Sequence, residues 1–246
     1  MTGAAIYTGG ISHPFEQAAP ALGTILDHVG FTARVSYELD EVLGWLKADP
    51  DALLVIYALR WSMTQDEKYA PHRARWSLML PDSAREAIAR HVLDGAGLMG
   101  VHTASICFDD WPEWRDVLGG AWRWGRTWHP TLGPVQVRLD QTHCIARGLP
   151  DFSLNDEVYS DLDFAPGIEI AAHAQAQCRT ESQREEASRA TGSQPALWMH
   201  RYGRGRVVCD SLGHDAASLA HPVHSRLLQR AALWACGRSR EIVEAI

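Results

Sequence analysis

The 246-residue sequence lacks several features that would assign it to a particular class of protein. It contains no uninterrupted run of about 18 apolar residues, so no membrane-spanning helix is expected. Residues 1–7 have neither the basic stretch nor the long apolar run of a signal peptide, and they are expected to begin the first strand. Acidic residues outnumber basic residues by 30 to 23, and no basic stripe is visible. Nucleic acids and membranes are therefore not expected partners.

Cysteine is also scarce. The five residues of this type are Cys107, Cys144, Cys178, Cys209 and Cys236. Their number is odd and no two have the C-x-x-C spacing, which argues against a disulfide framework or a zinc ribbon. We expect reduced thiols and a cytoplasmic location.

Nucleotide-binding fingerprints are missing as well. The stretches Gly119-Gly120 and Gly203-Arg204-Gly205-Arg206 do not follow a strand and open a helix, as a dinucleotide site or a P-loop requires. We interpret both as turns and expect no NAD or nucleotide cofactor.

Short apolar segments alternate with helical patterns in the first hundred residues. Strands are expected at residues 4–7, 32–36, 52–57 and 98–101, and helices at residues 15–29, 41–47 and after a capping box at residues 83–86. This alternation is typical of a doubly wound, mostly parallel sheet. Residues 60–80 interrupt the pattern and are expected to form a loop above the sheet.

The second half of the chain has a different pattern. Residues 135–139 alternate like an antiparallel or edge strand, residues 196–202 and 206–210 are expected to form a hairpin, and residues 222–236 form an amphipathic helix. The polar stretch 174–194 is interpreted as a solvated loop. We expect one domain spanning residues 1–246.

His102 holds the most informative position. It follows the expected strand 98–101 and opens a small-residue turn, where enzymes with a nucleophile elbow carry Ser or Cys. Ligands of open α/β sheets bind outside the carboxyl ends of the strands. A histidine at this point favours proton transfer or ligand binding over covalent acyl transfer.

Three other histidines follow strands or precede turns: His13, His129 and His214. Imidazole has the side-chain pKa nearest neutrality, which acid–base catalysis needs. For any single histidine, a structural role is the common alternative. We expect His102 and His214 to meet at one edge of the sheet as acid and base.

Carboxylates near these histidines complete the candidate site. The pair Asp156-Glu157 is either a solvated turn or a source of one carboxylate, Glu157, that orients a histidine. Asp215, next to His214, is a competing partner. Histidine with carboxylate can also hold a divalent metal such as zinc, but no H-E-x-x-H spacing is present, and the metal is left open.

Ten tryptophans are an unusual number for a chain of this length, and several cluster before residue 129. Large aromatic residues either fill a core or form a platform on which sugar rings stack. Trp128, together with His13, His129 and Asp215, is a candidate for binding substrate.

Five motifs in order resemble the ThuA-like (trehalose utilisation) family, within the class I glutamine amidotransferase-like superfamily. They are Thr8-Gly9-Gly10 with His13, Gly100-Val101-His102-Thr103-Ala104, Leu118-Gly119-Gly120, Asp156-Glu157-Val158-Tyr159, and the stretch from Tyr202-Gly203 to His214-Asp215. The resemblance implies a flavodoxin-like α/β fold, a three-layer sandwich, and a role in sugar catabolism. It does not imply glutaminase activity, because His102 replaces the elbow Cys and Cys107 lies too far along the chain.

The leading hypothesis is an isomerase, lyase or hydrolase that acts on a sugar or keto-sugar such as a trehalose-like disaccharide. His102 and His214 are its expected acid and base, and Glu157 is the orienting carboxylate. The alternatives are a sugar-binding or regulatory subunit without turnover and a metal-dependent hydrolase. The sugar, the metal and the oligomeric state, including a homo-oligomer, are left open.

Overall fold

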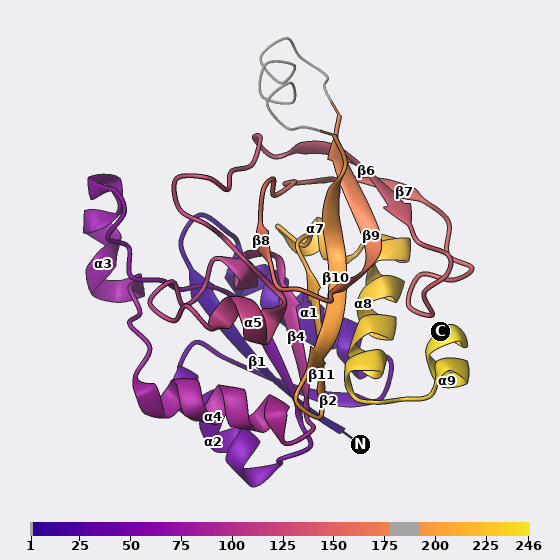
Figure 1. Cartoon of the computed structure of the whole chain (residues 1–246), viewed down its shortest axis with the longest axis horizontal. Coiled ribbons are helices and arrows are strands. Elements are labelled where there is room, and N and C mark those ends of the chain that lie inside the picture. The colour runs from indigo at the N-terminus through magenta and orange to yellow at the C-terminus, as the bar shows by residue number, and fades with distance from the viewer. Residues whose placement is uncertain (1, 178–191) are drawn as a thin grey trace.

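A nine-stranded sheet forms the centre of the protein in the computed structural model, which describes residues 2–177 and 192–246 (Figure 1). The strand order is β2-β1-β3-β4-β11-β10-β9-β6-β7. The strands are β1 (Thr2–Gly10), β2 (Phe31–Ser36), β3 (Leu53–Leu59), β4 (Gly97–Val101), β6 (Gly133–Leu139), β7 (Phe152–Asp156), β9 (Glu169–Ala176), β10 (Gln194–Tyr202) and β11 (Gly205–Asp210). Strands β5 (Gly120–Ala121) and β8 (Asp163–Phe164) form a separate small sheet.

The parallel half of the large sheet confirms the predicted fold class. Strands β2, β1, β3, β4 and β11 pair in parallel, in the order 2-1-3-4-5 that defines flavodoxin-like sheets. Every residue of β3 and β4 is buried, which explains their uninterrupted apolar sequences. Such strands need cover on both faces.

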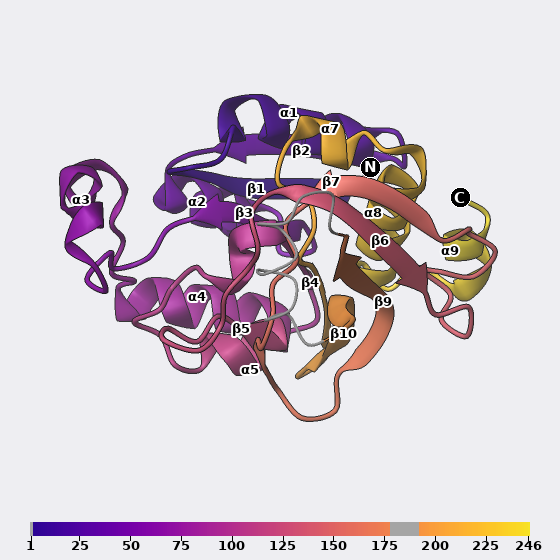
Figure 2. The ribbon, with the colours of Figure 1, turned by 90° about the horizontal axis from the view of Figure 1, so that it is seen from above.

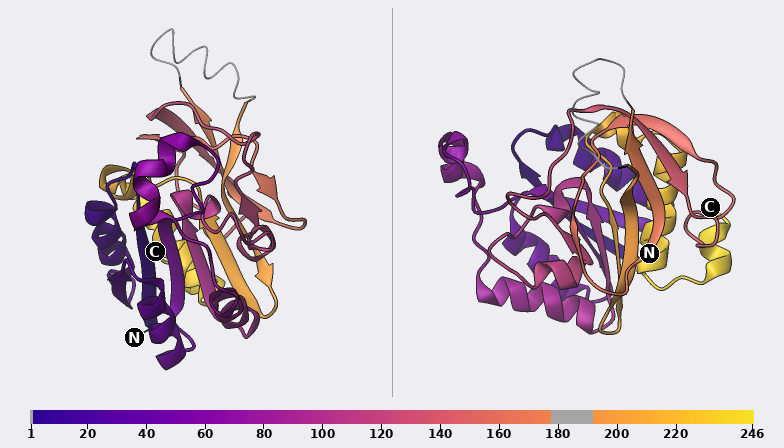
Figure 3. Two further views of the ribbon diagram at one scale, coloured as in Figure 1. Left: turned by 90° about the vertical axis from the view of Figure 1, so that its left-hand side faces the viewer. Right: turned by 45° about the horizontal axis from the view of Figure 1, so that its top comes forward.

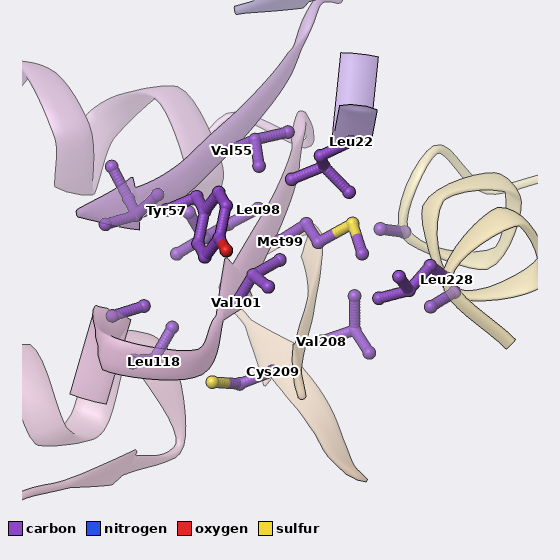
Figure 4. Close-up of a cluster of buried hydrophobic side chains, with 14 of the residues drawn as sticks. Leu22, Val55, Tyr57, Leu98, Met99, Val101, Leu118, Val208, Cys209 and Leu228 are labelled. Carbon is purple, nitrogen blue, oxygen red and sulfur yellow. The ribbon is translucent and has the colours of Figure 1, made fainter. Parts of the chain in front are cut away.

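Two groups of helices supply that cover (Figures 2 and 3). Helix α1 (Phe15–Asp27) packs against α8 (Pro222–Ala235), and α2 (Leu39–Ala48) packs against α4 (Asp82–Leu93). Figure 4 shows Leu22 and Leu228, from α1 and α8, pointing toward Met99 and Val208 of the sheet. Each fully buried side chain of this kind contributes roughly 1.5–3 kcal/mol through the hydrophobic effect.

The other strands extend the sheet with antiparallel pairs. The predicted hairpin of β10 and β11 is confirmed, and β9, β6 and β7 follow it. Strand β6 is antiparallel, as predicted, but it lies inside the sheet because β7 forms the edge. Figure 2 shows β6 and β7 passing across one end of the parallel strands. This crossing brings the end of β7 near the carboxyl ends of β4 and β11.

Three local predictions need correction. The stretch 60–80 is not wholly irregular, since it contains a 3-10 turn, Glu67–Tyr69, and helix α3 (Ala70–Trp76). The capping box does not form, because α4 begins at Asp82, which places Ser83 inside the helix and leaves Pro81 at the N-cap without a side-chain hydrogen bond. The ends of the expected loop 174–194 belong to β9 and β10, where Ala174 pairs with Val137 of β6. The middle of that stretch lies outside the described residues.

Within residues 2–177 and 192–246, no helix has the length and apolar character needed to cross a membrane.

Candidate functional site

His102 begins a 3-10 turn, His102–Ser105, directly after β4. Its φ of 50° lies in the left-handed region, and its side chain is fully buried. Gly100 allows Leu118 and Cys209 to pack closely against β4 just before this turn. A Cβ at this position would lie 2.7 Å from Leu118 Cδ1 and 2.8 Å from Cys209 Sγ. The strained strand-to-turn geometry resembles a nucleophile elbow that carries an imidazole.

His13 and His214 meet His102 at the carboxyl edge of the parallel strands. His13 lies just after β1 and His214 just after β11. The Nε2 atoms of His13 and His102 are 3.0 Å apart. The centre of the His214 ring lies 4.5 Å from that of His13 and 5.5 Å from that of His102. The structure therefore brings these three candidate histidines together, and the fourth, His129, lies beside Glu157.

Glu157 reaches the same point from the end of β7. Its Oε2 atom lies 3.5 Å from His102 Nε2 and 3.9 Å from His13 Nε2, and its Oε1 atom lies 3.4 Å from His214 Nδ1. Only 10% of the Glu157 side chain is exposed, and Oε2 has no hydrogen-bond partner. The donor atoms of the three imidazoles and Glu157 all lie within 4.8 Å of one another.

Asp156 holds the residues next to Glu157 and His214 in place. Its carboxylate accepts hydrogen bonds of 2.8 Å from the backbone N–H groups of Gly213 and Glu157, and a short one from the Ser218 hydroxyl. Sequence reasoning treated Asp156 only as one half of an acidic pair. Its role is to tie the end of β7 to the loop that carries His214.

A second buried pair braces the same loop. His224 donates through Nδ1 to the Ser218 carbonyl at 2.8 Å, and its Nε2 lies 3.1 Å from Asp210 Oδ2. Asp210 also accepts from Leu212 N. Burial lowers the pKa of His224, but the Asp210 carboxylate outweighs it and raises the pKa above the usual value. The sequence offered no signal for this pair, because His224 looks like an ordinary helix residue.

The electrostatics of the cluster push neighbouring pKa values apart. Burial alone would raise the pKa of Glu157, but the imidazoles of His102, His13 and His214 hold it well below its usual range. Burial lowers the pKa of His13. Burial also opposes protonation of His214, but Glu157 outweighs it and raises the His214 pKa. The centre thus combines an ionised carboxylate with imidazoles of unequal basicity.

Aromatic residues line one side of the cluster. The Tyr159 hydroxyl lies 3.2 Å from His102 Nε2, and the Tyr159 ring lies 5.4 Å from the ring of Trp122. His129 is half-exposed beside them, with Nδ1 3.7 Å from Glu157 Oε2. Sequence reasoning did not single out Tyr159 as a site residue, although it belongs to the motif that contains Glu157. A hydrogen-bonding residue two positions after the carboxylate was the available signal.

The tryptophans divide between the two roles considered for them. Trp111 and Trp114 are core residues, whereas Trp122 and Trp124 are partly exposed and continue the aromatic side of the cluster. Trp128 is held by a backbone bridge to Ser160, next to Tyr159.

Asp215 lies next to His214 and caps a short helix. Its carboxylate accepts a hydrogen bond of 2.8 Å from Ser218 N and caps the short helix α7 (Ala216–Leu219). It is not among the four clustered residues. The local reason is chain geometry, because an extended Asp before a helix satisfies the free N–H groups of the first turn.

Comparison with known proteins shows the family of the whole chain. The model of the ThuA family, described as trehalose utilisation, matches residues 4–235. No curated protein matches the sequence.

Solved structures share the fold. A ThuA-like protein from Parabacteroides merdae ATCC 43184 superimposes with a TM-score of 0.72 at 18% identity, over 96% of this chain and 91% of that one. A cytoplasmic protein from Salmonella typhimurium LT2 gives 0.58 at 13% identity, over 96% and 98%. A β-galactosidase from Rahnella sp. R3 gives 0.58 at 14% identity, over 97% of this chain but 32% of the enzyme. At these identities the likeness concerns the fold alone.

Proposed function

The chain belongs to the ThuA family, and from this we propose that it acts on a sugar or keto-sugar, such as a trehalose-like disaccharide, by proton transfer. The family description supports the substrate class. One observation supports the chemistry. Three imidazoles and an ionised carboxylate converge within 4.8 Å at the edge of the sheet where ligands of this fold bind.

The roles of the histidines follow from their hydrogen bonds and charges. His102 donates through Nδ1 to the Ser211 carbonyl at 2.8 Å, which leaves Nε2 as a base facing the cluster. His214, with its raised pKa, is suited to hold the proton that an acid must give. Glu157 orients both rings. Such a pair removes a proton next to a carbonyl without any covalent nucleophile.

Glutamine hydrolysis is not part of the proposal. The thiol that follows the elbow in the sequence, Cys107, is buried, and burial raises its pKa to about 12. A thiol of this kind carries almost no thiolate at neutral pH and is a poor nucleophile.

The aromatic side of the cluster supports a sugar as the bound partner. Trp122, with His129 and Tyr159, provides apolar surface beside polar groups, which is how sugar rings are commonly held. Trp128, whose backbone pairs with Ser160 next to Tyr159, is the second tryptophan we propose for this contact. The same surface supports a second candidate function, a sugar-binding subunit without turnover. We also propose a cytoplasmic location, because the four cysteines in the described residues are free.

Proton NMR in deuterated water tests the proposal. The purified protein is incubated with disaccharides and with their keto derivatives. Exchange of a proton bound to carbon next to the carbonyl, or a new product, is the expected result. Ligand-dependent stabilisation of the protein without exchange or product would favour the binding subunit. No response of either kind across the panel would contradict both functions.

A further inference from the structure

The ring nitrogens of His102 and His13 have defined roles because of their backbone partners. His102 Nδ1 lies 2.8 Å from the Ser211 carbonyl, and His13 Nδ1 lies 3.2 Å from the Ile11 carbonyl. A carbonyl oxygen only accepts, so both Nδ1 atoms carry the proton. In neutral imidazoles both Nε2 atoms then present lone pairs.

These two lone pairs face each other across 3.0 Å. Two acceptors at this separation repel unless a positive group lies between or beside them. The Tyr159 hydroxyl can donate to His102 Nε2, at 3.2 Å, but it leaves His13 Nε2 without a donor. Either an extra proton or a metal ion must balance the pair.

Two further polar atoms in the cluster also lack hydrogen-bond partners. Glu157 Oε2 and His214 Nδ1 are buried and make no hydrogen bond. The Glu157 side chain is nine-tenths buried, and leaving its charge uncompensated is costly. One shared proton satisfies two atoms at most, whereas a cation satisfies four.

The spacing of the four donors matches a metal site. Around a tetrahedral Zn²⁺ with bonds of about 2.0–2.1 Å, neighbouring ligand atoms lie roughly 3.3 Å apart. Here Glu157 Oε2 lies 3.5 Å from His102 Nε2 and 3.9 Å from His13 Nε2, and the two Nε2 atoms are 3.0 Å apart. These three separations are close to those of ligands around one ion, and the fourth residue, His214, offers a ring nitrogen within 4.8 Å of the other ligand atoms.

We propose that His13, His102, His214 and Glu157 bind one divalent transition-metal ion of the zinc type. Three imidazole nitrogens and one carboxylate oxygen are a donor set that suits Zn²⁺, Mn²⁺ or Fe²⁺ better than Ca²⁺ or Mg²⁺. The backbone supports the ligands as it does in metalloproteins, where a bound histidine gives its other N–H to a carbonyl. His102 and His13 both do so, toward Ser211 and Ile11.

The inference concerns the same side chains as the proposed function, but it does not require sugar turnover. With an ion bound, His102 and His214 would hold the ion and would not exchange protons, so the acid and base roles given above apply to the metal-free centre. Metal binding is therefore measured on its own, without substrate.

The first experiment determines the metal content of the untagged protein. Elemental analysis is made after purification without chelators, and the chelated protein is then titrated with Zn²⁺ and Mn²⁺ by calorimetry. We expect one ion per chain, a higher unfolding temperature with metal, and a visible absorption spectrum on loading with Co²⁺. A chain that binds no ion by any of these measurements overturns the proposal.

Variants define the ligand set. Glu157→Gln and His214→Ala are expected to weaken binding by more than the roughly 10- to 100-fold loss caused by a residue that merely supports a ligand. His129→Gln removes a neighbour at 3.7 Å, and His72→Gln removes an exposed histidine on α3. Neither is expected to change the affinity more than a few-fold. Equal losses for His129→Gln and Glu157→Gln overturn the assignment, and Co²⁺ loading of the unaltered protein tests it even where a variant does not fold.

The two proposals fail in different ways. Tight metal binding with no reaction in the NMR panel keeps the site and removes the proposed chemistry. Full sugar turnover by a chelated protein that takes up no metal keeps the chemistry and overturns the site.

Discussion

The Asp156 carboxylate accepts a hydrogen bond of 2.8 Å from the backbone N–H of Gly213, although Asp156 ends β7, Gly213 follows β11, and three strands separate β7 from β11 in the sheet. Strand β7 reaches Gly213 because it crosses the end of the parallel strands (Figure 2). The bond ties the acidic end of β7 to the loop after β11. It thereby positions Glu157 and His214, the neighbours of Asp156 and Gly213. Their atoms Glu157 Oε1 and His214 Nδ1 lie 3.4 Å apart.

Replacing Asp156 with Ala is expected to destabilise the protein by at least about 2 kcal/mol, because it leaves buried N–H and O–H donors without acceptors. Chemical denaturation measures the loss. Asp151→Ala is the matched control on the same strand region, since Asp151 is exposed and accepts one hydrogen bond, from Leu139 N. Its expected cost is about 1 kcal/mol. Equal costs for the two variants would show that Asp156 does not hold the loop.

The His102 variant tests the centre of the site. His102→Asn is expected to reduce kcat/KM by about a hundredfold or more, the usual effect of losing an acid–base group. The substrate is the sugar that reacts in the NMR panel, called the responsive sugar below. Asparagine tolerates the left-handed backbone at this position, whereas alanine adds strain of roughly 1 kcal/mol or more. His72→Asn, on the exposed face of α3, is the control for folding and purity. Unchanged kcat/KM in His102→Asn would remove His102 from the mechanism.

Much of the site could be predicted because its histidines follow parallel strands. Residues after β1, β4 and β11 meet at one edge of the sheet, whatever the loops between them do. The apolar runs of β3 and β4 and the hairpin glycines marked those strands clearly. The positions of His13, His102 and His214 therefore followed from local patterns plus one general rule of topology.

The supporting contacts could not be predicted in the same way. The bond between Asp156 and Gly213 depends on how far β6 and β7 curve across the sheet. That curvature results from many strand pairings together and cannot be deduced from a local pattern. The His224 and Asp210 pair depends on where α8 packs on β11. Periodicity reports which face of an element is buried but not which polar atoms meet there. Backbone acceptors such as the Ser211 carbonyl leave no trace in the sequence at all.

The aromatic side of the site gives a prediction about binding. Trp122→Ala is expected to weaken the affinity for the responsive sugar by about 2- to 10-fold, since an aromatic contact contributes roughly 0.5–1.5 kcal/mol beyond buried area. Titration by calorimetry or by tryptophan fluorescence measures the change. Trp234→Phe, a distant partly buried tryptophan on α8, is the control. An equal loss in both variants would indicate a general effect on the fold.

Cys107 gives a prediction about an activity that should be absent. We expect no release of ammonia or glutamate from glutamine, and we expect Cys107→Ser to keep full activity on the responsive sugar. The thiol lies 3.0 Å from the Ala58 carbonyl, and burial raises its pKa to about 12, so it remains protonated at neutral pH. Alkylation with iodoacetamide under native conditions should spare it. Glutamine hydrolysis that disappears in Cys107→Ser would contradict this assignment.

The buried pair of His224 and Asp210 predicts how stability depends on pH. The folded protein raises the pKa of His224 above the unfolded value of 6.5, because the Asp210 carboxylate outweighs burial. Protonation therefore favours the folded state, so this contribution is fully present below pH 6.5 and is lost as the pH rises through the raised value. The double variant His224→Gln with Asp210→Asn keeps hydrogen-bonding groups but removes both charges. Subtracting its free energy of unfolding from that of the unaltered protein isolates the contribution of the pair, since other histidines titrate in both. The difference should fall with rising pH above 6.5, and a difference that rises or stays flat would mean that His224 is neutral when folded.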